Sequence, residues 1–160
     1  MFIGPCYMLK NNGVSISTAI TALQLAPGST GPCEILRFAM TQSTNAVSSQ
    51  FGVMLVRKSA AATVTAAVTG TTLTKENPIA PTSAAVLSTS GTGITASAEG
   101  TNTEQSITRG GNVLNGVEWL PTPEERLMIP ASGFVGLTFM TAPASSTWQA
   151  ELVWRELRAS

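Results

Sequence analysis

The chain has 160 residues with nine acidic and nine basic side chains, so its formal net charge is zero. Hydrophobic residues make up 43% of it but charged residues only 11%, less than half the roughly 25% of an ordinary soluble domain. This length predicts one domain with a real core, and with a net charge of zero nothing in the composition directs the protein to DNA, RNA or an acidic membrane surface. A surface so poor in charge favours association with other copies or a larger assembly; the alternative is a monomer kept soluble by its hydroxyl groups.

The first residues predict an arm in front of the domain. Gly4-Pro5 and the Asn-Asn-Gly sequence that ends at Gly13 are turn signals. Residues 1–13 are therefore expected to form a short N-terminal arm, and residues 14–160 a single β-sandwich domain. No signal peptide is expected, because a basic leader followed by a long apolar stretch is missing. No run of about 18 apolar residues predicts a membrane span.

Most of the remaining chain has the pattern of short strands separated by turns. Over Gln50–Lys58, Phe51, Val53 and Leu55 lie at every second position, which places them on one face of a strand. Further strands are expected in Val14–Leu25, which holds one or two, and in Cys33–Thr41, Ala84–Ser88 and Phe134–Thr141. Two proline turns bracket a short segment, Arg126–Ile129, and Glu118–Leu120 leads into this C-terminal part of the chain. About eight such strands with Gly, Pro and Asn turns between them predict an all-β fold, a jelly-roll-like antiparallel β-sandwich.

The middle of the chain has weaker patterns. Ser59–Gly70, rich in Ala and Thr, is interpreted as extended chain or loop. Thr89–Gly111, rich in Gly and Thr, is interpreted as one long connection, which in a compact domain is functional, mobile or held by a partner. Asn115-Gly116 then predicts a tight turn.

The last segment has two possible interpretations. In Thr147–Glu156, Trp148 and Trp154 fall on the same face if the chain is a strand. Residues 147–158 also fit helical spacing, with Ser146 and Gln149 as a capping box. The alternation and the position at the chain end favour a strand, with a helix as the alternative.

The side chains that most catalysts use to move protons are missing. The sequence has no histidine and no aspartate, and all nine acids are glutamates. A serine or cysteine nucleophile normally needs a base, most often histidine, and metal sites of jelly-roll enzymes need histidine ligands. We therefore expect no enzyme, no catalytic or metal-binding residue, no cofactor and no small-molecule substrate.

The remaining chemical motifs are each weak. Glu99 and Glu104 share one expected loop, and the Glu124-Glu125 pair fits a solvated turn. Gly91–Ala96 matches the dinucleotide fingerprint in its letters, but no strand–turn–helix unit surrounds it. Two cysteines, Cys6 and Cys33, have no spacing that decides whether they form a disulfide.

Five groups of segments carry a family resemblance: Thr21–Pro27 with Glu34–Arg37, Gln50–Arg57, Asn115-Gly116 with Trp119–Pro121, the turn from Pro130 to Gly133, and the closing Glu151–Glu156. Together they resemble the small jelly-roll decoration, or cement, proteins on the heads of tailed bacteriophages. Residues 59–112 lie outside this resemblance.

The resemblance implies a virion structural protein, made in the host cytoplasm and located on the outer surface of the capsid. It would bind the major capsid protein where subunits meet, stabilise those contacts, and associate with itself as a dimer or trimer. Such binding stabilises the assembled shell by mass action, and repeated sites add avidity. Nucleic acid and membrane are not expected partners.

The candidate partner contacts come from the expected arm, the long connection and one tryptophan: Phe2, Ile3, Tyr7, Met8, Thr92, Ile94 and Trp119. Trp119 precedes a proline turn, so its ring is either exposed or part of the core, whereas core packing is expected for Trp148 and Trp154. The alternative function is a carbohydrate- or receptor-binding module of a phage tail or fibre, in which an exposed Trp119 would stack on a sugar.

Overall fold

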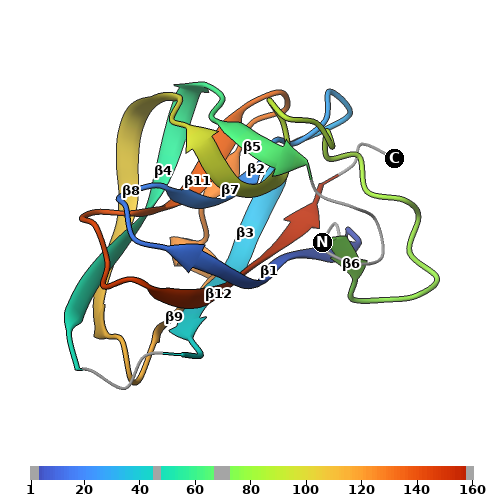
Figure 1. The fold of residues 1–160 in the computed structure, drawn as a ribbon. Helices are drawn as coiled ribbons and strands as arrows, with labels where there is room; N and C mark the ends of the chain where they lie inside the picture. Colours follow the sequence, from blue (N-terminus) through green and yellow to red (C-terminus); the bar gives the residue numbers. More distant parts are fainter. Residues whose placement is uncertain (1–3, 45–47, 67–72, 158–160) are drawn as a thin grey trace.

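The computed structural model describes residues 4–44, 48–66 and 73–157, which form two antiparallel six-stranded sheets packed face to face (Figure 1). The first sheet contains β1 (Cys6–Ile16), β3 (Cys33–Gln42), β6 (Leu73–Lys75), β9 (Val117–Trp119), β10 (Met128–Ile129) and β12 (Ser146–Glu156). The second contains β2 (Thr21–Leu25), β4 (Gln50–Ala60), β5 (Thr63–Ala66), β7 (Gly93–Ala98), β8 (Thr101–Asn112) and β11 (Phe134–Phe139). The predicted all-β antiparallel sandwich is confirmed, with twelve strands in the described residues instead of about eight.

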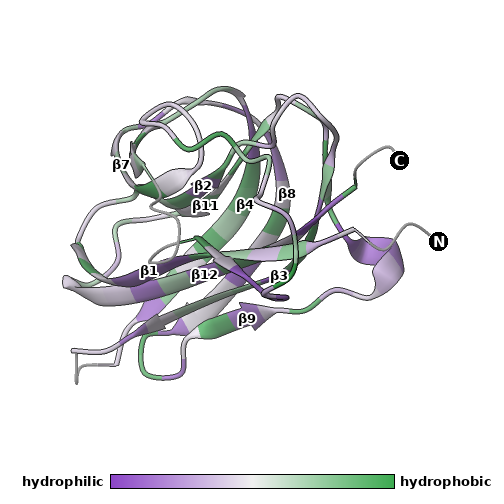
Figure 2. Cartoon of the chain, turned by 90° about the vertical axis from the view of Figure 1, so that its right-hand side faces the viewer, coloured by the Kyte–Doolittle hydropathy of each residue, from purple (hydrophilic) through white to green (hydrophobic). Residues whose placement is uncertain are grey.

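The strand order shows which segments form the centre of each sheet. The first sheet runs β10-β3-β12-β1-β6, with β9 also beside β3, and the second runs β5-β7-β2-β11-β4-β8. A short 3-10 turn, η1 (Pro123–Glu125), precedes β10. Apolar colour is concentrated in strands such as β4, whereas β8 at the edge is largely hydrophilic or neutral (Figure 2).

The last strand, β12, is the central strand of the first sheet. Its Leu152 lies opposite Leu9 of β1 on one side and Phe38 of β3 on the other. Trp148 and Trp154 are both fully buried. The strand interpretation is confirmed and the helical one is wrong, because only a period of two puts both indole rings into the same core.

The segment expected as an arm is largely part of this sheet. β1 pairs with β12 along its whole length, and Tyr7 and Leu9 are buried. Gly13, with φ of +101°, lies where the register shifts between Asn12 and Val14. The turn signal therefore marks a bulge inside a strand, and the arm prediction is wrong from Cys6 onward. Phe2 and Ile3 lie outside the described residues.

The expected long connection over Thr89–Gly111 is also wrong. β7 pairs with β5 and β8 pairs with β4, so β4–β5 and β7–β8 are the two arms of one long bent ribbon, whose halves lie on either side of β2 and β11 in the second sheet. At the bend, a Cβ on Gly100 would lie 2.0 Å from the carbonyl oxygen of Ala60. The buried Gln24 amide fixes the same bend, because it bonds both the N–H and the C=O of Ala62.

The two cysteines lie on opposite sides of β12. Cys6 of β1 is opposite Arg155, and Cys33 of β3 is opposite Glu156. Two strand spacings amount to about 10 Å, more than the roughly 7 Å that a disulfide can span between Cα atoms. Both cysteines are therefore thiols.

Candidate partner-binding surface

The segment between β6 and β7, residues 76–92, runs outside the sheets as the light green loop of Figure 1 and is tied to them by hydrogen bonds. Near its start, the Tyr7 hydroxyl donates to the carbonyl oxygen of Pro81 at 2.8 Å. The Lys75 ammonium donates to the carbonyl oxygen of Ala80, also at 2.8 Å. These bonds hold the backbone of the loop against β1 and β6.

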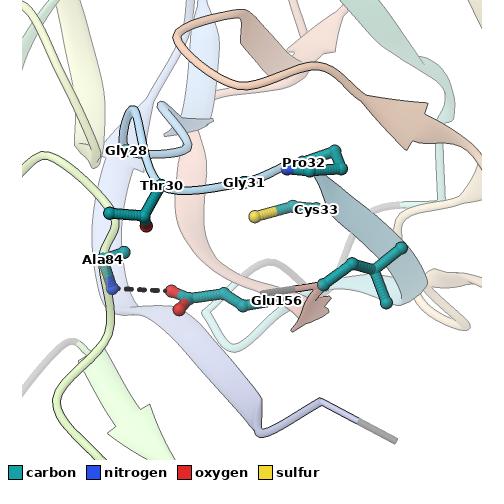
Figure 3. A pocket seen from close by; sticks show the side chains of 8 residues that line it. Gly28, Thr30, Gly31, Pro32, Cys33, Ala84 and Glu156 are labelled. Atoms are coloured by element: carbon teal, nitrogen blue, oxygen red, sulfur yellow. Dashed lines mark hydrogen bonds between the residues drawn. The ribbon is translucent and has the colours of Figure 1, made fainter. Parts of the chain in front are cut away.

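The middle of the loop is held by a carboxylate at the end of β12. Glu156 is buried and accepts a hydrogen bond from the Ser83 hydroxyl. It also accepts one from the Ala84 backbone N–H at 2.8 Å, drawn as the dashed line in Figure 3. A Cβ on Gly28 would lie 2.1 Å from the Ala84 carbonyl oxygen, so the loop packs directly on the backbone after β2. The cavity between these residues has a volume of about 0 Å³, so the loop packs against the end of β12 and the chain after β2 with no room for a ligand.

The end of the loop is fixed to the chain just after β2. The Val86 N–H donates to the carbonyl oxygen of Ala26 at 2.9 Å. The Thr92 hydroxyl, fully buried, accepts from the Ala26 N–H at 2.9 Å and bonds the Ala26 carbonyl at 3.2 Å. Residues 76–92 are thus anchored at the start, the middle and the end although they form no long strand.

This anchored loop exposes large apolar side chains. Ile79 is 89% exposed, Val86 48% and Leu87 37%. Beside Ile79 lies an open hollow of about 480 Å³, whose walls include Pro5, Cys6, Asn77 and Ala80. Apolar side chains on a preordered backbone are a good docking element, because little chain entropy remains to be lost on binding. We call residues 76–92 the anchored loop.

The outer face of the first sheet has a different character. Arg37 forms ion pairs with Glu118 and Glu151, and Glu34 forms ion pairs with Arg126 and Arg155. These four pairs are most of the six found in the described residues. These six side chains, three acidic and three basic, therefore have partners of opposite sign within the same chain, and together they present little net charge to another molecule.

Two of the predicted contact residues, both fully buried, fix the anchored loop through their hydroxyl groups. Tyr7 of β1 bonds the loop backbone at Pro81, and Thr92 at the end of the loop bonds the backbone of Ala26. Met8 is half-buried and lies opposite Val153 in the first sheet. Ile94 is half-buried, packs against the core, and is in β7 rather than in a loop. Phe2 and Ile3 cannot be placed within the described ranges.

Trp119 belongs to the core. Its side chain is 4% exposed and its ring stacks on Phe38, with ring centroids 5.7 Å apart. The two residues are paired across β9 and β3, which brings the rings together. The possibility of an exposed ring at this position is therefore wrong.

The alternating patterns in the sequence did not predict that apolar residues of the anchored loop are exposed. Ala84–Ser88 was predicted as a strand, yet Leu87 makes only an isolated bridge with Thr92. The available signal is Ile79 between two prolines, followed by Val86 and Leu87 among alanines and serines. Apolar residues without either period, next to prolines, mark a loop that keeps them exposed.

The acids of the middle segment do not converge. Glu99 pairs with Lys58, and Glu104 pairs with Arg57 at 2.7 Å. Over residues 4–44, 48–66 and 73–157, no group of three or more His, Cys, Asp or Glu side chains is placed to hold a metal ion. The same part of the chain contains no helix long and apolar enough to cross a membrane.

Comparison with known proteins finds no family model, no curated protein and no solved structure that matches this chain. The anchored loop, with Ile79, Val86 and Leu87 exposed on a fixed backbone, is therefore the feature of the structure that bears most directly on function.

Proposed function

We propose that this protein is a virion structural protein that decorates the outer surface of a tailed-phage head and stabilises contacts between major capsid subunits. The observation that carries the proposal is the anchored loop, which holds Ile79, Val86 and Leu87 in solvent on a fixed backbone. The segments that resemble cement proteins are the reason for proposing the phage head as the binding partner. The protein would be made in the host cytoplasm and act on the assembled capsid.

The physical basis of this function is binding alone. A protein that binds the assembled shell better than its separated subunits stabilises the shell by mass action. An apolar loop that is already ordered retains most of its contact energy as affinity. The low charge of the chain, 11% of residues, suits a surface that is covered in the working state.

The jelly-roll arrangement is part of the same proposal. It is supported by two long antiparallel ribbons, β1 with β12 and β4–β5 with β8–β7, the second of which bends so that its halves lie on either side of β2 and β11. Wrapped antiparallel ribbons are the building principle of jelly rolls.

Co-sedimentation with empty heads tests the function. Purified protein is mixed with heads assembled from the major capsid protein encoded in the same genome, and the bound fraction is measured. The double variant Ile79→Ser with Val86→Ser is expected to lower the affinity at least about tenfold, as loss of apolar anchors does. The matched control is Leu114→Ser, since Leu114 is also an exposed apolar residue but lies in the turn between β8 and β9.

The two parts of the proposal fail in different ways. Wild-type protein that does not bind such heads overturns the decoration function. Wild-type binding that the double variant retains removes the anchored loop from the contact. The alternative of a sugar- or receptor-binding module depended on an exposed Trp119, and the burial of that ring leaves it without a supporting observation here.

A further inference from the structure

β8 is the long exposed edge of the second sheet. It has 12 residues, whereas the other edge strands of the described structure, β5, β6, β9 and β10, have 4, 3, 3 and 2 residues. It pairs with β4 on one side, and on the other only a bridge from Asn112 to Gly116 covers its end. In Figure 1 it is the gold strand at the outer side of β4. Long open edges are rare because they pair with other strands.

The free hydrogen-bonding groups of this edge can be assigned from the ladder. The Val113 N–H donates to the Ser49 carbonyl toward β4, and the Met140 N–H donates to the Gly52 carbonyl from β11. Because alternate residues of a strand point their N–H and C=O to opposite sides, those of Thr108 and Gly110 point away from β4. They face solvent, where the Arg109 guanidinium bonds the Thr108 carbonyl at 3.0 Å.

A bulge in β8 arranges its side chains symmetrically. The register passes from Leu55 opposite Ile107 to Val56 opposite Gln105, so Ser106 is the extra residue. Arg109 lies opposite Val53 and Glu104 opposite Arg57. Since Val53, Leu55 and Arg57 share one face of β4, Arg109, Ile107 and Glu104 also share one face of β8. Glu104 and Arg109 are each one ladder repeat from Ile107, on opposite sides.

We propose that β8 pairs in antiparallel fashion with β8 of a second copy of this chain, about a two-fold axis at Ile107. This register places Ile107 against its counterpart and faces each Arg109 with Glu104 of the other copy. The Thr108 N–H faces the bulge of the other strand, and so does the Thr108 carbonyl once Arg109 turns from it to Glu104 of the other copy. The two second sheets then become one continuous sheet. Without the bulge, Glu104 and Arg109 would lie on opposite faces and could not meet.

The charges favour a second copy over an unrelated strand. Arg109 has no carboxylate partner within the described residues of its own chain, and Glu104 is 56% exposed beside Arg57. In the dimer each Glu104 would lie between Arg57 and the partner's Arg109. An edge whose opposite charges are equally spaced from an apolar centre is complementary to itself.

The dimer also deepens the proposed function. The idea that the dimer is the form that binds a shell rests on the proposed function. Two anchored loops on one dimer would then add avidity. As a dimer in solution it requires no shell, so its test is independent of the co-sedimentation result.

Two charge variants test the pairing by analytical ultracentrifugation. Arg109→Glu leaves Glu opposite Glu, and Glu104→Arg leaves Arg opposite Arg, so each variant alone is expected to dimerise at least about tenfold more weakly than wild type. An equimolar mixture of the two places Glu opposite Arg at both contacts, so dimers are expected to return. Recovery on mixing shows that both variants are folded and that the two positions face each other.

A backbone variant gives a second readout. Thr108→Pro removes an N–H that points away from β4, so the dimer is expected to be lost while thermal unfolding of the monomer stays nearly unchanged. A monomeric wild-type protein at high micromolar concentration overturns the proposal. A dimer that persists in both Arg109→Glu and Thr108→Pro uses another surface and overturns it as well.

Discussion

The ammonium group of Lys58 lies 2.8 Å from Oε2 of Glu99, near the bend of the ribbon of β4–β5 and β7–β8. The Lys58 side chain is fully buried and also donates to Oδ1 of Asn102 at 3.1 Å. Glu99 accepts further bonds from the backbone N–H and the hydroxyl of Thr21. The pair thus connects both arms of the ribbon to β2, and breaking it would leave a buried cation without its counter-charge.

This pair predicts a loss of stability in acid. Burial raises the pKa of Glu99, but the hydrogen bonds from Lys58 and Thr21 and the charge of Lys58 outweigh burial and lower the pKa below 4.5. A carboxyl group with a lowered folded-state pKa stabilises the fold above its ordinary pKa, and this contribution is lost as the pH falls through the lowered value. The Tm of the wild-type protein is therefore expected to decrease as the pH falls below about 4.5.

The variant Glu99→Gln separates this pair from the other carboxylates. It is expected to be less stable than wild type at pH 7, by about 1–3 kcal/mol, because the buried Lys58 loses its counter-charge while partial exposure of the site limits the loss. The difference between the two proteins should shrink as the pH falls toward 3. A constant difference over the whole pH range would contradict this role for Glu99.

Gly100 at the bend of the ribbon is expected to tolerate no side chain. Gly100→Ala would place a Cβ 2.0 Å from a backbone carbonyl, so the two arms must separate, and we expect a loss of about 2–4 kcal/mol in the free energy of unfolding. The matched control is Gly110→Ala in the open edge strand, where the nearest atom is 3.8 Å away and a change within about 0.5 kcal/mol is expected. Urea unfolding measures both, and equal effects would contradict the close approach.

Trp119 is expected to act in stability. Removal of its buried ring and of the stacking on Phe38 in Trp119→Ala should lower the free energy of unfolding by about 3–5 kcal/mol. Leu120→Ala changes the next residue, which is 73% exposed, and should have an effect within about 0.5 kcal/mol. Chemical denaturation distinguishes the two, and a fully stable Trp119→Ala protein would show that the ring contributes little to the core.

Where one face of a strand is buried, the sequence alone predicted the element. Phe51, Val53 and Leu55 alternate in β4, and Trp148 and Trp154 alternate in β12, and both strands lie where the pattern placed them. The anchored loop and the buried ring of Trp119 had no such pattern, since the bonds from Tyr7, Thr92 and Glu156 and the stacking on Phe38 all join distant parts of the chain.

The class of fold was thus determined by the sequence itself, because a strand with one buried face needs an apolar residue at every second position, and this alternation is visible in the sequence. The tertiary structure alone decided that Cys6–Gly13 is a strand, that β8 is an edge and that Ile79 stays in solvent. An edge strand such as β8 has little buried face, and its bulge at Ser106 shifts the alternation, so only the neighbouring strand β4 reveals which of its groups are free.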